Sequence, residues 1–218
     1  GAAASCERLP GRRSGGRPDA AHAFGRSRSV LYADKMPETL ECYPACQQNL
    51  HETERIATLK AAGASEIYAV ELSKERGAKA LELGATAVIN PKEEPDVVGK
   101  IHDLTNGGAD VAFEVTGVPA VLQQAIDSTA FEGETVIVSI WEKEPTIKPN
   151  NIVLSERTVK GIIAYRDIFP AVMNLMTKGY FPADKLITKR IKLDDVVPEG
   201  FETLTKDKDQ IKILVSSK

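Results

Sequence analysis

The chain has 218 residues and a formal charge of -3 at pH 7, so it can bury a sizeable core in one large domain or two small ones. This charge gives no global attraction for nucleic acid or for an anionic membrane. No apolar run reaches the roughly 18 residues of a membrane span. We therefore expect neither nucleic acid nor a membrane as a partner.

Cysteine usage bounds the compartment and the metal chemistry. Cys6, Cys42 and Cys46 all lie in the N-terminal quarter of the chain. The spacing of Cys42 and Cys46 does not fit a zinc knuckle, and no second pair follows. A packed part without cysteine is typical of a reducing compartment, so we expect a cytoplasmic protein without a metal site.

Residues 1 to about 29 are rich in Gly, Ala, Ser and Arg, with six arginines against Glu7 and Asp19. Because no apolar periodicity runs through this stretch, we expect a disordered or non-native N-terminal segment over residues 1–50. An organelle transit peptide and a basic arm for nucleic acid stay open as alternatives. The first residue is Gly1 rather than Met, which favours a fragment, a processed form or an incomplete gene product.

Helix and strand signals alternate from residue 51 onwards, whereas only 29–33 resembles a strand before that point. Such alternation is typical of a parallel sheet covered by helices. In chain order the sequence predicts helix 52–62, strand 66–71, a helix between an N-cap at Ser73 and a stop at Gly84, strand 85–89, helix 96–104, strand 109–115, helix 119–129, strand 134–140, strand 158–164, helix 169–177, strand 186–193, a helix from Asp195 and strand 211–215.

Glu71 carries the clearest sign of a ligand site, because it ends the predicted strand 66–71. A carboxylate at the tip of the second strand of a dinucleotide fold accepts both ribose hydroxyls of NAD and repels the 2′-phosphate of NADP. Arg76 follows one helical turn later, where it can lie over the adenine ribose. Taken alone, each residue also fits a solvated surface position.

Three segments carry a family pattern, namely Ala61-Ala-Gly-Ala-Ser-Glu-Ile-Tyr-Ala-Val-Glu-Leu-Ser73, Ala109-Asp-Val-Ala-Phe-Glu-Val-Thr-Gly117 and Asp207-Lys-Asp-Gln-Ile-Lys-Ile-Leu-Val215. In this order they resemble the zinc-dependent medium-chain alcohol dehydrogenases, and among them the 2,3-butanediol and sorbitol dehydrogenases. The resemblance extends over about residues 56–218. It implies an oxidoreductase that transfers hydride from a small secondary alcohol to NAD.

The resemblance also assigns cofactor contacts to individual positions. Glu71 and Arg76 match the ribose and adenosine contacts of the family, while Thr116 and Gly117 close the fourth strand against the cofactor. The positions that match the segments around the nicotinamide ring are Val138, Ser139, Ile140, Ile163 and Ala164. Without the resemblance, these apolar positions would be assigned to the sheet core.

The glycine-rich phosphate turn is the main departure from the family. Aligned back from Ala61, its three glycines fall at Gln47, Asn49 and Glu52. Glycines let the backbone approach the pyrophosphate, and Glu52 places a negative charge where phosphates sit at a helix N-terminus. Losing two charge-assisted hydrogen bonds costs roughly 3–6 kcal/mol, or about 100- to 10,000-fold in affinity. We therefore expect weak or absent NAD binding.

The strand that precedes this turn is missing from the family pattern as well. In the doubly wound order 3-2-1-4-5-6 it lies between the second and fourth strands, and 29–33 is the substitute that the sequence offers. We predict an α/β, Rossmann-type doubly wound parallel sheet that is incomplete, because its first strand and glycine loop are missing. Residues 51–180 then form the NAD-binding domain, and 181–218 a return segment whose strands belong to the family's catalytic domain. Exposed strand edges there favour self-association into a homo-oligomer.

Catalytic groups are not expected in this chain. The resemblance places the zinc ligands and the proton relay of the family in an N-terminal domain that the sequence does not match. His22, His51 and His102 offer no replacement, because Arg55 stands where a zincin helix needs its second His. We expect no metal ligand and no catalytic residue here, and no alcohol oxidation by the chain alone. The alternative function is a non-catalytic interaction module with a basic N-terminal arm.

Overall fold

The computed structural model describes residues 28–32, 52–163, 169–181, 183–207, 210 and 212–217. Several predicted features lie outside the described residues, namely residues 1–27 of the basic arm, the three cysteines, Gln47 and Asn49 of the phosphate turn, and Ala164 on the nicotinamide side. Over the described ranges, no helix has the length and apolar character needed to cross a membrane.

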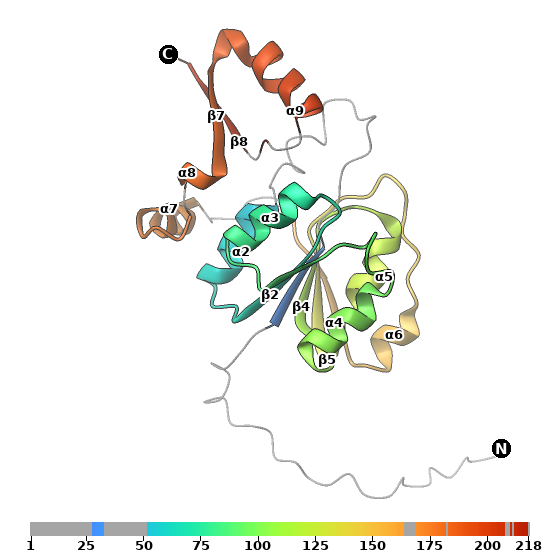
Figure 1. Cartoon of the computed structure of the whole chain (residues 1–218). Helices are drawn as coiled ribbons and strands as arrows, with labels where there is room; N and C mark the ends of the chain where they lie inside the picture. The colour runs from blue at the N-terminus through green and yellow to red at the C-terminus, as the bar shows by residue number, and fades with distance from the viewer. Residues whose placement is uncertain are drawn as a thin grey trace, which may run out of the picture.

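Within the described residues, six parallel strands form the main sheet in the order β3-β2-β1-β4-β5-β6 (Figure 1). In this doubly wound order the first strand, β1, lies near the centre of the sheet. The direction in which successive strands are added reverses between β1 and β4. The predicted α/β Rossmann-type class is therefore confirmed. The strands are β1 (Arg28–Tyr32), β2 (Glu66–Val70), β3 (Ala87–Ile89), β4 (Ala109–Glu114), β5 (Thr129–Ile137) and β6 (Thr158–Gly161).

The prediction that the first strand is missing was wrong, because β1 occupies that position. Val30 of β1 lies opposite Tyr68 of β2 and Ala112 of β4, and both pairings are parallel. Val30 and Leu31 have no exposed surface, as expected for a central parallel strand that is covered on both faces. The sequence indicates the strand but not its partners, because those partners are distant along the chain.

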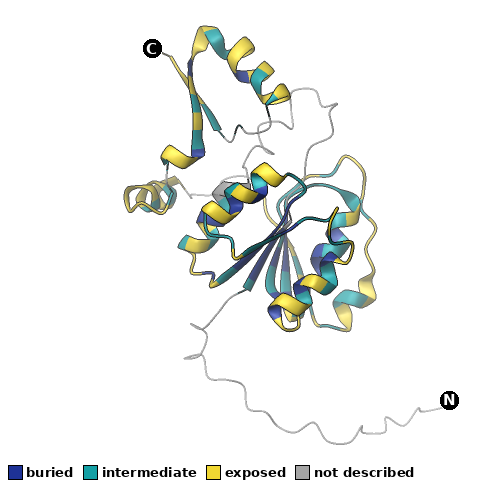
Figure 2. Cartoon of the chain, viewed as in Figure 1, coloured by how far each residue is buried: buried dark blue, intermediate teal, exposed yellow. Residues whose placement is uncertain are grey.

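Helices cover both faces of the sheet, with α2 and α3 on one face and α4 and α5 on the other (Figure 1). Successive side chains of β1 point to opposite faces of the sheet. Leu31 shares a core with Ile56 of α2, whereas Val30 shares one with Ile101 of α4. Figure 2 shows the buried strands between these layers. The described helices are α2 (Glu52–Ala61), α3 (Lys74–Glu82), α4 (Val97–Thr105), α5 (Pro119–Asp127), α6 (Pro149–Val153), α7 (Phe169–Thr177), α8 (Ala183–Leu186) and α9 (Glu202–Lys206).

Two differences from the predicted elements have a physical reason. β5 begins at Thr129 rather than at residue 134. The pairing of β5 with β4 shifts register between Thr129 and Glu134, and Gly133 permits close packing there, since a Cβ on that residue would lie 2.7 Å from Thr129 Cβ. The helices α6 and α8 were not predicted, because their 5 and 4 residues carry too little periodicity to detect.

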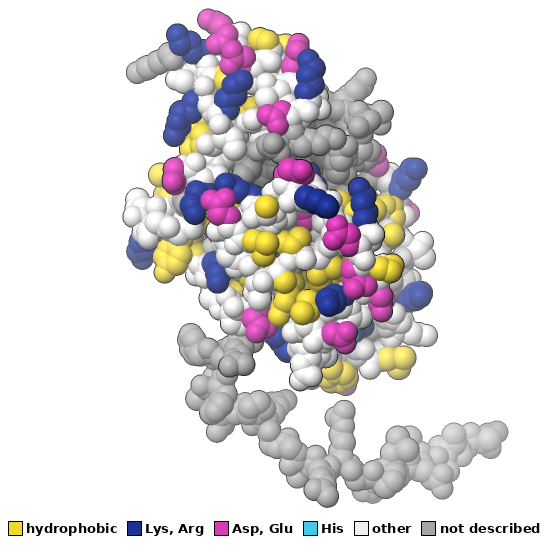
Figure 3. Space-filling view, in the orientation of Figure 1, with side chains coloured by type: hydrophobic (Ala, Val, Ile, Leu, Met, Phe, Trp, Pro, Cys, Tyr) yellow, Lys and Arg dark blue, Asp and Glu magenta, His cyan; other side chains and the backbone are white. Residues whose placement is uncertain are grey.

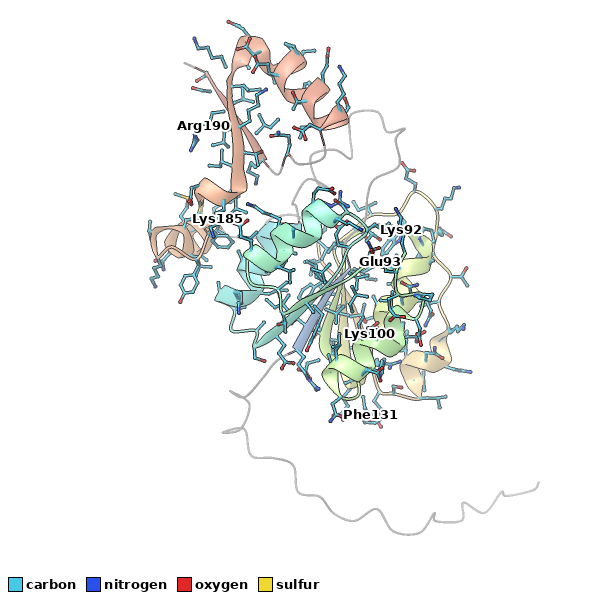
Figure 4. All side chains as sticks on the ribbon, in the orientation of Figure 1. Lys92, Glu93, Lys100, Phe131, Lys185 and Arg190 are labelled. Carbon is cyan, nitrogen blue, oxygen red and sulfur yellow. The ribbon has the colours of Figure 1, made fainter. Side chains whose placement is uncertain are left out.

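The C-terminal part forms a separate two-stranded parallel sheet of β7 (Ile187–Lys192) and β8 (Lys212–Ser216). Between them lie η2 (Leu193–Asp195), a π-helical turn η3 (Val196–Phe201) and α9, in place of the one helix predicted from Asp195. Basic and acidic side chains are mixed over this part of the visible surface (Figure 3). Lys185 of α8 lies close to α3 (Figure 4), where its Nζ is 3.3 Å from Glu82 Oε1.

Candidate functional site

The candidate site lies at the carboxyl ends of the main-sheet strands. In an open doubly wound sheet, ligands bind outside these ends at the point where the strand order reverses. Glu71 follows β2 on one side of that point, and Glu114 ends β4 on the other. Figure 4 marks this end of the sheet by Lys92 and Glu93, which follow β3, whereas Phe131 lies at the opposite end. We call the carboxyl ends, with the turns that follow them, the rim.

The Glu71 carboxylate is held on the β2 side of the rim. Its side chain is buried, and its backbone N–H donates to Ile89 O at 3.0 Å, which extends the pairing of β2 with β3. Oε1 accepts from Ser73 N at 2.6 Å and from Arg76 Nη2 at 2.5 Å, while Oε2 accepts from Arg76 Nε at 3.0 Å. The structure thus brings together the two residues to which the sequence assigned the ribose.

Local sequence positions this pair. Ser73 begins α3 as its N-cap, and its Oγ accepts from Arg76 N at 3.3 Å. The cap fixes the first turn of the helix, so the Arg76 side chain reaches back over the end of β2. The guanidinium forms a bidentate pair with the carboxylate and uses much of its capacity to accept hydrogen bonds. A ribose that approaches Glu71 must share or displace these hydrogen bonds.

Glu114 is the central residue on the other side of the rim, and the sequence analysis missed it. Its side chain is fully buried. Oε1 accepts from Thr116 N at 2.8 Å, Thr116 Oγ1 at 2.7 Å and Gly117 N at 3.0 Å. Oε2 accepts a short hydrogen bond from Ser139 Oγ. One carboxylate therefore binds the turn after β4 and the turn after β5.

Gly117 allows these two turns to touch. Its φ is +70°, a conformation that favours glycine, and a Cβ on it would lie 3.0 Å from Ile140 O. The backbone bond from Val138 N to Glu114 O, at 2.9 Å, joins the same two chain segments. The predicted residues Thr116, Gly117 and Ser139 thus form one cluster around Glu114.

The remaining predicted residues on this side are partly or largely exposed at the rim. Val138 is half-buried. Ile140 is 56% exposed and Ile163 is 73% exposed, which leaves apolar surface open at the ends of β5 and β6. Apolar side chains beside a few polar groups are typical of the lining of a small-molecule site.

Sequence reasoning missed Glu114 because its role depends on a turn from another strand. The local signal that was available is a glutamate at the end of a mostly apolar strand, two residues before Thr116. Buried charges need several hydrogen bonds, so such a residue predicts a cluster of donors. The identity of Ser139 as one of the donors does not follow from the local pattern.

The described residues offer little for a metal ion. Over these ranges, no group of three or more His, Cys, Asp or Glu residues is placed to hold one. His102 of α4 has its Nε2 2.8 Å from Asp127 O at the end of α5, which joins two helices on the face of the sheet. His22 and His51 lie outside the described ranges.

Known proteins match most of the chain. The family of zinc-binding dehydrogenases matches residues 55–178, more than half of the sequence. An (R,R)-butanediol dehydrogenase of Bacillus subtilis is 66% identical over 160 residues, which cover 73% of this chain and 46% of that protein. An (R,R)-butanediol dehydrogenase of Neisseria gonorrhoeae is 41% identical over 162 residues, covering 73% and 46%.

Among solved structures, the crystal structure of 2R,3R-butanediol dehydrogenase from Bacillus subtilis has a TM-score of 0.77 and 55% sequence identity. The match covers 88% of this chain and 51% of that one. The chain therefore spans about half the length of the relatives it matches.

Proposed function

Because the chain belongs to the zinc-binding dehydrogenase family, we propose that its main sheet holds NAD in a dehydrogenase of small secondary alcohols. The 66% identity to an (R,R)-butanediol dehydrogenase supports a vicinal diol such as 2,3-butanediol as the substrate. NAD, when bound, supplies the hydride acceptor. This proposal concerns the complete enzyme, of which the chain covers the cofactor side.

The buried Glu71 carboxylate at the rim is the observation that carries the proposal. It accepts hydrogen bonds from the hydroxyls of the adenosine ribose. Arg76 then shifts its hydrogen bonds to Glu71 and lies over the same ribose. A carboxylate on a side chain without exposed surface is poorly screened by water, so it repels a 2′-phosphate at close range. NAD is therefore favoured over NADP.

The nicotinamide half lies across the point where the strand order reverses. Polar groups of the turns after β4 and β5 orient the carboxamide and ribose there, and apolar side chains pack against the ring and exclude water. The residues that we assign to this half are Thr116, Gly117, Val138, Ser139, Ile140, Ile163 and Ala164.

Alcohol activation needs groups beyond those in the described ranges. Since these ranges provide no three-residue metal-ligand group, we assign no zinc-dependent step to their residues. We propose that residues 51–180 form the NAD-binding unit and that 181–218 return to the catalytic part of the enzyme. Phe201 and Val215 are exposed, which supports the proposal that this segment packs against another part of the enzyme. Purified on its own, the chain should give no NADH absorbance with 2,3-butanediol or sorbitol.

An AMP titration tests the adenosine site directly. Amide shifts in an NMR spectrum of the full chain give the affinity for AMP, and Glu71→Gln should weaken it about tenfold, as expected when a charged acceptor becomes neutral. Glu134→Gln is the control, because that side chain lies on β5 with Lys160 as its ion-pair partner, at 3.9 Å. Equal affinity for AMP in the wild type and in Glu71→Gln would contradict the proposal.

A further inference from the structure

We propose that Glu114 is a positioning residue for the nicotinamide half of the dinucleotide. This inference rests on the proposed function and adds a residue to the same site. Its physical basis is that one buried side chain holds the turn after β4 and the turn after β5, to which we assign the nicotinamide. Glu114 itself is buried beneath these turns and acts through them.

The donors around Glu114 are matched to its two oxygens. Oε1 accepts two backbone N–H groups and the Thr116 hydroxyl from the turn after β4, whereas Oε2 accepts the Ser139 hydroxyl from the turn after β5. All of these groups donate, and a carboxylate only accepts. The charge-assisted bonds therefore fix the relative position of the two turns.

Thr116 extends this arrangement to the next helix. Its Oγ1 donates to Glu114 Oε1 at 2.7 Å and accepts from Val118 N at 2.9 Å. Val118 is the N-cap of α5 and has no side-chain capping bond of its own. The carboxylate thus also sets the direction of the Thr116 hydroxyl and the start of α5.

Gly117 shows how little freedom this part of the rim has. Its amide donates to Glu114 at 3.0 Å, and its Cα faces Ile140 O so closely that a Cβ would reach within 3.0 Å. Both turns therefore depend on the same carboxylate for their spacing. A displacement of about 1 Å in a positioning element can cost about a hundredfold in reaction rate.

The adenosine side is built from different residues. Glu71 is fixed by Ser73 and Arg76, which belong to α3 and the turn before it. Distant sites without shared partners respond to substitution almost independently. Loss of the Glu114 contacts should therefore weaken the binding of the nicotinamide half and leave the binding of the adenosine half unchanged. A general loss of folding would weaken both.

Glu114→Gln and Glu114→Ala separate positioning from mere space filling. In the glutamine variant the side-chain carbonyl can take the place of Oε1, and its NH2 group can donate to Ser139 Oγ. The geometry of both turns is then kept. In the alanine variant the donors lose their shared acceptor, so the two turns are no longer joined.

The test is an NMR titration of the full chain with nicotinamide mononucleotide and, separately, with AMP. We expect Glu114→Ala to weaken the binding of nicotinamide mononucleotide about ten- to a hundredfold, because the donors of both turns lose their acceptor. Its affinity for AMP should change less than about twofold. Glu114→Gln should stay close to wild type, and Glu134→Gln serves as the matched control. In the wild type, nicotinamide mononucleotide should shift the amides of Thr116, Gly117 and Ser139.

The possible results separate the two claims. If AMP does not bind but nicotinamide mononucleotide shifts those amides, the adenosine proposal fails and the inference about Glu114 stands. If nicotinamide mononucleotide leaves them unchanged in the wild type, or if Glu114→Ala binds it normally, the inference is overturned. Should Glu114→Ala not fold, Glu114→Asp replaces it, because its carboxylate is one methylene shorter and cannot accept from the donors of both turns at once. Unchanged binding of nicotinamide mononucleotide by that variant would then overturn the inference.

Discussion

The Arg76 guanidinium donates to both oxygens of the buried Glu71 carboxylate, Nε to Oε2 at 3.0 Å and Nη2 to Oε1 at 2.5 Å. The Glu71 side chain has no exposed surface, and that of Arg76 is 20% exposed. The pair links the end of β2 to the first turns of α3. The pair stabilises the fold. It also uses the carboxylate oxygens to which we assign the hydroxyls of the adenosine ribose.

Arg76→Ala should lower the free energy of unfolding by about 1–3 kcal/mol. The buried Glu71 loses its charged partner, which costs roughly 3–5 kcal/mol in a fully buried pair, and the partial exposure of Arg76 reduces the cost. Urea unfolding of the two proteins measures the difference. Lys74→Ala is the control, because Lys74 and Glu93 form an exposed pair at 3.6 Å and its loss should cost less than about 0.5 kcal/mol. Equal losses in both variants would contradict this account.

The sequence predicted this side of the rim better than the other. Glu71 ends a strand and Ser73 caps the next helix, so both positions follow from local patterns. Arg76 lies one turn further along the same helix, which places it within reach of Glu71. The contact is local in sequence, so local patterns placed both residues at the same end of β2, although they did not predict the ion pair itself.

Tertiary contacts explain what the sequence did not predict. The place of β1 between β2 and β4 depends on strand pairing over long separations, which composition does not encode. Glu114 gains its role from Ser139, which lies in the turn after β5, the next strand of the sheet. Short polar ends of strands, such as Thr129 at the start of β5, carry no clear alternation of apolar and polar residues.

Gly117→Ala should destabilise the protein by about 1–3 kcal/mol. A non-glycine residue is strained at a φ of +70°, and the new Cβ would press against Ile140 O at 3.0 Å. Thermal or urea unfolding measures the loss. Gly161→Ala on β6 is the control, since a Cβ there has nothing within 4 Å. The explanation fails if both variants unfold at the same urea concentration.

Tyr68 should make stability decline at alkaline pH. Burial raises the pKa of its phenol above the ordinary 10.0, and the Glu66 carboxylate raises it further. The unfolded chain ionises near its ordinary pKa, so this contribution is fully present below about pH 10 and is lost as pH rises through the folded-state pKa. Tyr68→Phe should therefore lose less stability between about pH 9 and pH 11 than the wild type.

Urea unfolding across this pH range is the measurement for the Tyr68 prediction. Tyr180→Phe is the matched control, because Tyr180 is 49% exposed and its substitution should leave the alkaline decline in place. An identical decline in the wild type and in Tyr68→Phe would show that another group is responsible.

The C-terminal sheet should cause self-association of the isolated chain. Within the described ranges, β7 and β8 pair only with each other, so strand edges stay open. Val215 of β8 is 45% exposed, and a lysine on an edge strand discourages edge-to-edge pairing. Light scattering should report a larger mass for the wild type than for Val215→Lys. Val153→Lys on α6, where Val153 is 70% exposed, should not reduce the mass. A strictly monomeric wild type would contradict the prediction.

The binding of NAD compared with NADP by the full chain tests the central claim most directly. Parallel NMR titrations give both dissociation constants from the same amide signals near Glu71 and Ser73. With Glu52 and other non-glycine residues at the phosphate-turn positions, NAD should bind in the millimolar range or more weakly. NADP should bind at least about tenfold more weakly than NAD, because its 2′-phosphate meets the buried Glu71 carboxylate. NADP binding as tight as NAD binding would contradict the assignment of Glu71 to the ribose.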